Sequence, residues 1–141
     1  MEYKLELVVV PVSDVDRAKA FYERAGFILE SEHGSDTGFR VVQLSPPGSA
    51  CAIAIGSGMP QAEPGTTKGL HLVVDDIHAA HADLTAKGIP VGEPFHFGEQ
   101  GMAPGPDPER RSYNSFMQFD DPDGNVWLVQ EVHRAADGSA A

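Results

Sequence analysis

Residues 12–20 read VSDVDRAKA, and 62 positions later residues 74–82 read VDDIHAAHA. Each stretch follows an apolar run of the kind that forms a buried strand. In each stretch an Asp (Asp14, Asp76) stands where it can cap a helix, and a Gly follows at the same distance, where a helix would end. The two stretches therefore predict the same strand-then-helix unit twice.

A second match extends the repeat at a longer shift. Residues 43–47 read QLSPP, and 75 positions later residues 118–122 read QFDDP. The two shifts differ by 13 (75 − 62), so the second copy carries about 13 extra residues, which fit in the Gly- and Pro-rich stretch 93–113. Two matches in the same order indicate a duplicated module.

Each copy is predicted to be a βαβββ module, which gives an α+β fold. Residues 1–62 form the first module, 63–134 the second with the long loop 93–113, and 135–141 a tail, together one structural domain. The helices are expected over 14–25, where Val15, Ala18, Phe21 and Tyr22 recur at helical spacing, and over 76–87. The strands are expected over 5–12, 27–32, 39–44, 50–55, 70–74, 90–95, 115–119 and 125–131.

Composition excludes several classes of protein. The chain has 141 residues, and its 10 Lys and Arg against 21 Asp and Glu give a formal net charge of −11. This balance argues against binding to nucleic acid or to an anionic membrane. The single Cys51 excludes an internal disulfide, and no signal-peptide profile or membrane-span-length apolar run is present in the sequence. A soluble, cytoplasmic protein is expected.

Three phrases of the sequence resemble one superfamily. They are DVDRAKAFYERAGF at 14–27, VDDI at 74–77 and DPDGN at 121–125. Together they resemble the vicinal oxygen chelate superfamily, which includes glyoxalase I, bleomycin-resistance and fosfomycin-resistance proteins and extradiol dioxygenases. The resemblance covers about residues 4–132. It implies two tandem modules whose curved mixed sheets form a ligand-binding cup, and it implies a homodimer.

Metal-using members of that superfamily carry His or Glu ligands on the first and last strand of each module. Carried over from the helix-opening Asp and the DPDG turn, these positions fall on Leu7, Ile53, Gly69 and Leu128. None of the four offers the oxygen or imidazole donor that a divalent ion needs. We therefore expect no metal and no cofactor. A two-residue slip in the second module would bring His71 into a ligand position, but one His does not make a site.

Alternation along the strands predicts what lines the cup instead. His71 is the candidate catalytic residue, as a general acid or base; the alternative is a wall residue that donates to a carbonyl or to Gln130. Cys51 is expected to line the wall as a small buried hydrophobe; the alternative is a nucleophile, which would need a nearby base and a lowered pKa. Trp127 is expected to pack beneath the helices. The predicted ligand-binding residues are Leu7, Val9, Cys51, Ile53, Ile55, His71, Val73, Phe97, Met102, Leu128 and Gln130.

The stretch 93–113 is long enough to be a lid over the cup. Phe95, Phe97 and Met102 would then close over an apolar ligand. The alternative is a surface loop or dimer contact, in which Arg110 and Arg111 pair with Asp107 and Glu109.

Three functions follow from these expectations. The first is binding of a small, largely apolar organic molecule in a metal-free cup, with His-assisted acid–base chemistry of an isomerase, lyase or cyclase type if the protein is an enzyme. The second is non-catalytic sequestration of a cationic antibiotic or metabolite. The third, disfavoured by the missing ligands, is a divalent-metal-dependent lyase or dioxygenase.

Overall fold

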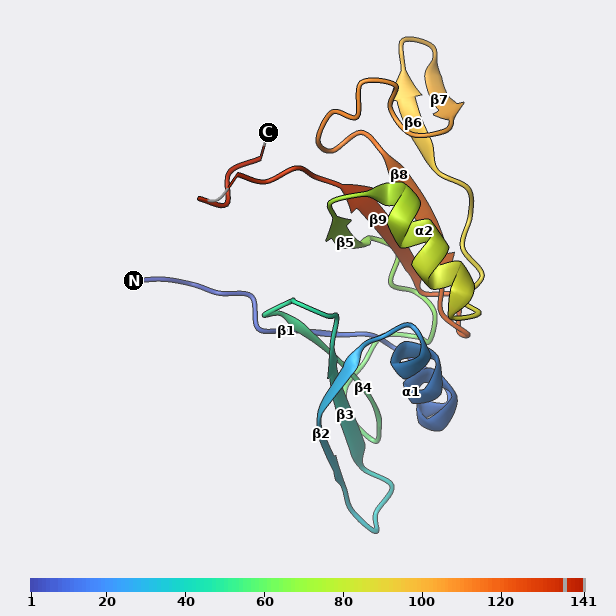
Figure 1. Ribbon diagram of the computed structural model, residues 1–141. Helices are drawn as coiled ribbons and strands as arrows, with labels where there is room; N and C mark the ends of the chain where they lie inside the picture. Colours follow the sequence, from blue (N-terminus) through green and yellow to red (C-terminus); the bar gives the residue numbers. More distant parts are fainter. Residues whose placement is uncertain (136, 141) are drawn as a thin grey trace. The chain divides into compact units, whose positions relative to one another are not determined.

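The computed structural model describes residues 1–135 and 137–140 and shows an α+β fold with two mixed sheets (Figure 1). The chain divides into two compact units. Unit 1 comprises Met1–Thr67 and Asp121–Asn125, and unit 2 comprises Lys68–Asp120 and the described residues from Val126 onward. The expected tail, 135–141, includes residues 136 and 141, which lie outside the described residues. No helix in the described part of the chain is long and apolar enough to cross a membrane.

Unit 1 is a four-stranded sheet with one helix. Its strands follow the order β1-β4-β3-β2, with β1 parallel to β4 and the other neighbours antiparallel. The expected first strand, 5–12, is shorter in the structure. The elements are β1 (Leu7–Val9), α1 (Val15–Arg24), β2 (Ile28–Gly34), β3 (Arg40–Ser45) and β4 (Ala52–Ser57).

Helix α1 begins and ends where the sequence predicts. The Asp14 side chain caps it by accepting a hydrogen bond from the Arg17 N–H at 3.0 Å. Gly26, with φ of 106°, adopts the left-handed conformation that follows the helix end. Phe21 and Tyr22 are buried on the helix face that packs against β3 and β4.

The turn Asp121–Asn125 completes unit 1, although it comes from the far end of the chain. The buried Asp121 carboxylate accepts a hydrogen bond from the Tyr22 hydroxyl at 2.7 Å. The Asn125 amide donates to the Pro11 carbonyl at 2.8 Å and accepts from the Thr67 N–H at 3.0 Å. These bonds tie the turn to three separate places in unit 1's first segment.

Unit 2 repeats the pattern with one addition. Its strands follow the order β5-β9-β8-β6-β7, with β5 parallel to β9. Helix α2 contacts β8 and β9, and Trp127 is buried on that side of the sheet, as predicted. The elements are β5 (Leu70–Val74), α2 (Ile77–Ala86), β6 (Phe95–Gly98), β7 (Gly101–Pro104), β8 (Phe116–Asp120) and β9 (Val126–Glu131).

The addition is β7, which forms a hairpin with β6 within the stretch expected to be a loop. Strands β6 and β7 pair from Phe95↔Pro104 to Gly98↔Gly101 around a two-residue turn, and Gly101 has a φ of 98°. Figure 1 shows this hairpin projecting from one end of the second sheet. The Gly and Pro residues that suggest a loop stand at the ends of the hairpin, while Phe95 and Phe97 alternate as in a strand. The expected strand 90–95 thus gives way to β6.

Candidate functional site

Two of the predicted ligand-binding residues do not share a face with Leu7 and Val9. In unit 1, Leu7 pairs with Ala52 and Val9 with Ala54, so these side chains point to one side of the sheet. Ile53 and Ile55 point to the other side and are buried, with 3% and 0% of their surface exposed. They belong to the core beside α1, which corrects their expected place in the wall with Leu7.

The cause is a one-residue difference between the two hairpins. In unit 1 Gln43 pairs with Ala54, whereas in unit 2 Gln118 pairs with Leu128. The first hairpin therefore holds one residue more, and Ala54, not Ile53, is the counterpart of Leu128. A slip of one residue moves a side chain to the opposite face of a sheet. Cys51 precedes β4, is half-buried, and has its Sγ 3.6 Å from the Ala52 carbonyl oxygen.

In unit 2 the predicted residues do share a face. His71 pairs with Leu128 and Val73 with Gln130, while the buried Trp127, Val129 and Glu131 point to the opposite side. Strand β8 continues this face, because Phe116 pairs with Gln130. His71 and Val73 extend this face along β5. The six residues that we call the aromatic face are Phe95, Phe97, Met102, Phe116, Leu128 and Gln130.

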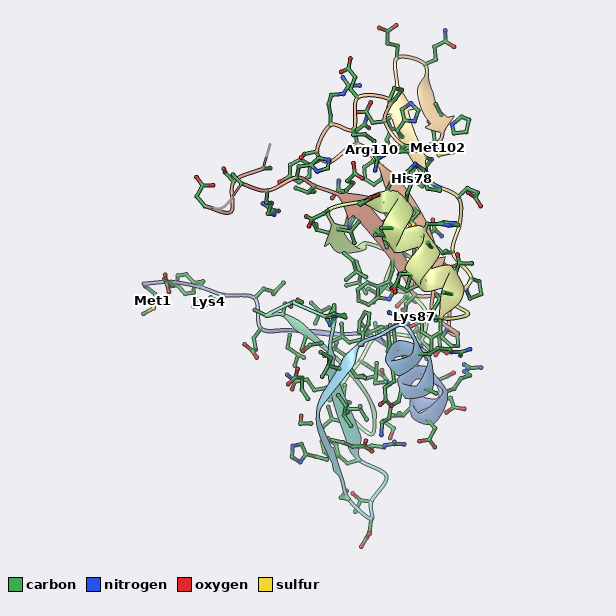
Figure 2. The ribbon with its side chains drawn as sticks, in the orientation of Figure 1. Met1, Lys4, His78, Lys87, Met102 and Arg110 are labelled. Atoms are coloured by element: carbon green, nitrogen blue, oxygen red, sulfur yellow. The ribbon has the colours of Figure 1, made fainter. Side chains whose placement is uncertain are left out.

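Three phenylalanines form the centre of the aromatic face. The rings of Phe95 and Phe116 stack with centroids 5.5 Å apart, and Phe97 meets Phe116 edge-on at 5.7 Å. Phe97 is 53% exposed, and Met102, its partner across the β6–β7 hairpin, is 69% exposed. Figure 2 labels Met102 on that hairpin. Sequence reasoning missed Phe116, which the alternation from Gln118 could have identified.

His71 is exposed, and its hydrogen bond fixes how its ring can act. Its Nδ1 lies 2.8 Å from the Gly69 carbonyl oxygen. Because a carbonyl only accepts, Nδ1 carries the hydrogen, and in the neutral ring Nε2 holds the lone pair. His71 thus makes the carbonyl contact considered for a wall residue, and its Nε2 is the nitrogen that could take up a proton.

Carboxylates border the aromatic face at one edge. A groove of about 490 Å³ is lined by Glu93, Phe95, Gln118 and Asp120 among others, and a second of about 340 Å³ shares Glu93 and Phe95 with it. Among the described strand residues that point to this side of the sheet, Asp120 at the end of β8 is the one with a charged side chain. The centre of the face is therefore apolar and its edge is acidic.

The two arginines of the loop after β7 are held by carboxylates. Arg111 donates through Nε to the buried Asp107 at 2.7 Å, as one sequence reading predicts. Arg110 instead donates through Nε to the buried Glu131 at 2.9 Å and also contacts Asp76 at the N-terminus of α2. Figure 2 labels Arg110 in this loop. Both guanidinium groups thus serve the fold of unit 2.

Hydrogen bonds from these arginines lower the pKa of their carboxylate partners. The Arg110 side chain is the largest cause of the lowered pKa of Glu131, about 2, although burial opposes it; the Ile77 N–H also contributes. The Arg111 side chain likewise holds the pKa of Asp107 well below its usual value. Both carboxylates are therefore charged at neutral pH and act as structural anchors.

The vicinal oxygen chelate superfamily, which the sequence resembles, carries metal ligands at four positions. The residues that this chain has at those positions do not fit a divalent ion. With the register corrected they are Leu7, Ala54, Gly69 and Leu128, which have neither oxygen nor imidazole in their side chains. In the described ranges 1–135 and 137–140, no group of three or more His, Cys, Asp or Glu side chains could hold a metal ion.

Comparison with known proteins matches the chain to one protein family and to solved structures that share its fold. Residues 4–129 match the Glyoxalase family, described as the Glyoxalase/Bleomycin resistance protein/Dioxygenase superfamily. A curated relative is the uncharacterized protein YetH of Bacillus subtilis (strain 168), which is 24% identical over 127 residues, covering 88% of this chain and 94% of that protein.

Two solved structures from Streptomyces sp. CB03234 are also similar. TnmS3, described as an antibiotic binding protein, is 30% identical with a TM-score of 0.70, over 92% of this chain and 96% of that chain. A glyoxalase/bleomycin resistance protein is 31% identical with a TM-score of 0.67, over 90% of this chain and 99% of that chain.

Proposed function

Because the chain belongs to the Glyoxalase/Bleomycin resistance protein/Dioxygenase superfamily, we propose that it binds a small, largely apolar organic molecule on the aromatic face. The cluster of Phe95, Phe97 and Phe116 carries this proposal, since it offers exposed ring surface for stacking. His71 and Gln130 supply polar groups that can orient the ligand. The description of TnmS3 as an antibiotic binding protein supports the same class of function.

The test is a titration with N-phenyl-1-naphthylamine, a neutral aromatic probe that fluoresces on apolar surfaces. Phe97→Ala removes an exposed ring, and we expect it to weaken probe binding about tenfold, the loss that corresponds to one ring contact. Phe39→Ala is the matched control, because Phe39 is a partly exposed Phe in unit 1. Equal effects of both substitutions, or no binding by the unaltered protein, would refute the proposal.

A second candidate is acid–base catalysis by His71. It is favoured by the Nδ1 contact with Gly69, which leaves Nε2 as the basic nitrogen of the neutral ring. An isomerase or lyase of this kind would remove a proton next to a carbonyl. Deuterium from D₂O should then enter the methyl group of 2-acetylnaphthalene faster with the protein than without it. The acceleration should vanish in His71→Gln and persist in His33→Gln, a substitution of an exposed His on β2. Equal rates in both variants would exclude His71 as the base.

A cationic ligand is favoured by a different observation, the carboxylates of Glu93 and Asp120 in the groove beside Phe95. A cationic aromatic dye such as thioflavin T should then bind more tightly than the neutral probe and lose affinity as salt rises. Glu93→Gln combined with Asp120→Asn should weaken the dye and leave the neutral probe unchanged. Glu99→Gln, in the exposed turn after β6, is the control. If the dye binds no better than the neutral probe, the ligand is not selected by charge.

A further inference from the structure

Strand β6 is joined to β8 by one residue pair of the sheet ladder, Phe95 with Phe116. Continuing this antiparallel register by two residues places Phe97 opposite Asn114. A regular ladder would there supply backbone hydrogen bonds to Phe97. Asn114, however, lies outside β8, which begins at Phe116. The exposed ring of Phe97 thus lies on a strand whose backbone pairing to β8 has already ended.

The side chain of Asn114 replaces the missing backbone pair. Its Oδ1 accepts a hydrogen bond from the Phe97 N–H at 3.1 Å, and its Nδ2 donates to the Phe97 carbonyl at 3.0 Å. The backbone leaves the strand here because Tyr113 has a φ of 73°, in the left-handed region. The Gln130 amide donates to the Tyr113 carbonyl at 3.1 Å.

The two bonds to Phe97 fix how the Asn114 amide is turned. The Phe97 N–H can only donate, so it meets Oδ1, and the Phe97 carbonyl can only accept, so it meets the NH₂. The buried Asp107 lies near this side chain, since Asn114 is one of the smaller causes of the lowered pKa of Asp107, after the Arg111 side chain.

We propose that Asn114 is a positioning residue for the aromatic face, which fixes Phe97 edge-on to Phe116 by pairing with the Phe97 backbone. This inference rests on the proposed binding of an organic molecule at that face. Asn114 acts through Phe97, so its loss frees this end of the β6–β7 hairpin and leaves the ring without a fixed place beside Phe116. Ligand affinity then falls because the ring must be ordered at each binding event.

The test combines hydrogen exchange with probe binding in the full chain. In Asn114→Ala the Phe97 amide should exchange roughly tenfold faster, since it loses its acceptor, and N-phenyl-1-naphthylamine should bind about fivefold more weakly. Asn114→Asp keeps the acceptor but brings a second carboxylate to Asp107, and it should weaken binding at neutral pH as well. Gln100→Ala, in the exposed turn of the same hairpin, should change neither measurement.

A double variant separates positioning from a general structural role. In the Phe97→Ala background, Asn114→Ala should cause no further loss of probe affinity, because the ring it positions is gone. A further loss of similar size would overturn the proposal, as would unchanged exchange of the Phe97 amide in both Asn114 variants. If the unaltered protein does not bind the probe, the proposed function fails, while the exchange measurement still decides whether Asn114 holds Phe97.

Discussion

At the scale of single residues, Glu131 shows how a charge is kept inside unit 2. Its carboxylate is fully buried at the N-terminus of α2, where it accepts a hydrogen bond from the Ile77 N–H at 2.9 Å. Arg110 donates to it from the loop after β7, and His133 Nε2 lies 3.1 Å away. A buried carboxylate with several donors and the positive end of a helix nearby is stable as an anion.

Glu131 should make the protein sensitive to acid. Its pKa falls from 4.5 to about 2 on folding, so between these values the unfolded chain binds more protons. The stabilisation, on the order of 3 kcal/mol, is therefore complete above about pH 5 and lost as the pH falls towards 2. Urea unfolding from pH 7 to pH 2.5 should show this loss, and Glu131→Gln should be less stable at pH 7 with a flatter pH profile. An equally steep profile in the variant would assign the acid sensitivity elsewhere.

The residues of the site show what could be predicted from sequence and why. His71, Val73, Leu128 and Gln130 share a face as predicted, because alternation needs only the correct starting residue on each strand. Ile53 was misplaced because the mapping between modules assumed hairpins of equal length. Asn114 was missed, since nothing in the sequence marks an Asn whose side chain replaces a backbone pair.

At the scale of elements, the turn Asp121–Asn125 binds α1 to the segments that flank unit 1's sheet, through Tyr22, Pro11 and Thr67. The Asp121 carboxylate is buried and accepts from the Tyr22 hydroxyl, the Asn125 amide at 2.7 Å and the backbone N–H of Asp123 and Asn125. Each donor offsets part of the cost of burying the charge. The DPDGN phrase thus serves the packing of unit 1, which explains why it indicates the fold and not the chemistry.

Tyr22→Phe should destabilise the protein by about 1–3 kcal/mol, because it removes one donor from a buried carboxylate and changes no other atom. The measurement is the free energy of unfolding in urea. Tyr3→Phe is the control, since Tyr3 is 92% exposed. A change below about 0.5 kcal/mol in Tyr22→Phe, the size expected at a surface position, would mean that the Asp121 carboxylate does not depend on this hydroxyl.

The hairpin β6–β7 marks the limit of prediction for elements. Both helices and the repeated strands were predicted from periodicity and caps, with ends that differ by a few residues. The sequence predicts a loop in place of this hairpin, because its strands have four residues each and are bounded by Gly and Pro. Such short strands carry too few alternations to stand out from a loop.

At the scale of the whole molecule, the net charge of −11 and the exposed apolar residues of unit 1 bear on which partners the protein can bind. The charge favours solubility and disfavours anionic partners. Leu7, Val9 and Ile28 in unit 1, by contrast, are each at least 40% exposed, and such surface in a folded protein often marks an interface. Together with the family, this surface leads us to propose a homodimer.

The dimer is tested by light scattering coupled to size-exclusion chromatography. We expect a mass of two chains for the unaltered protein and of one chain for Leu7→Lys combined with Val9→Lys, because two charges at these positions oppose burial. Lys4→Leu, at an exposed position near the N-terminus, should leave the mass unchanged. A single-chain mass for the unaltered protein at micromolar concentration would refute the dimer.

The place of the Asp121–Asn125 turn in unit 1 bears on how the protein is made. On the ribosome, residues 1–67 emerge first, yet Tyr22, Pro11 and Thr67 still lack their partners at that moment. Those partners appear only after residues 68–120, the larger part of unit 2, have been translated. The first half of the chain therefore waits, incompletely folded, for the second, so the order of synthesis is not the order in which folding is completed.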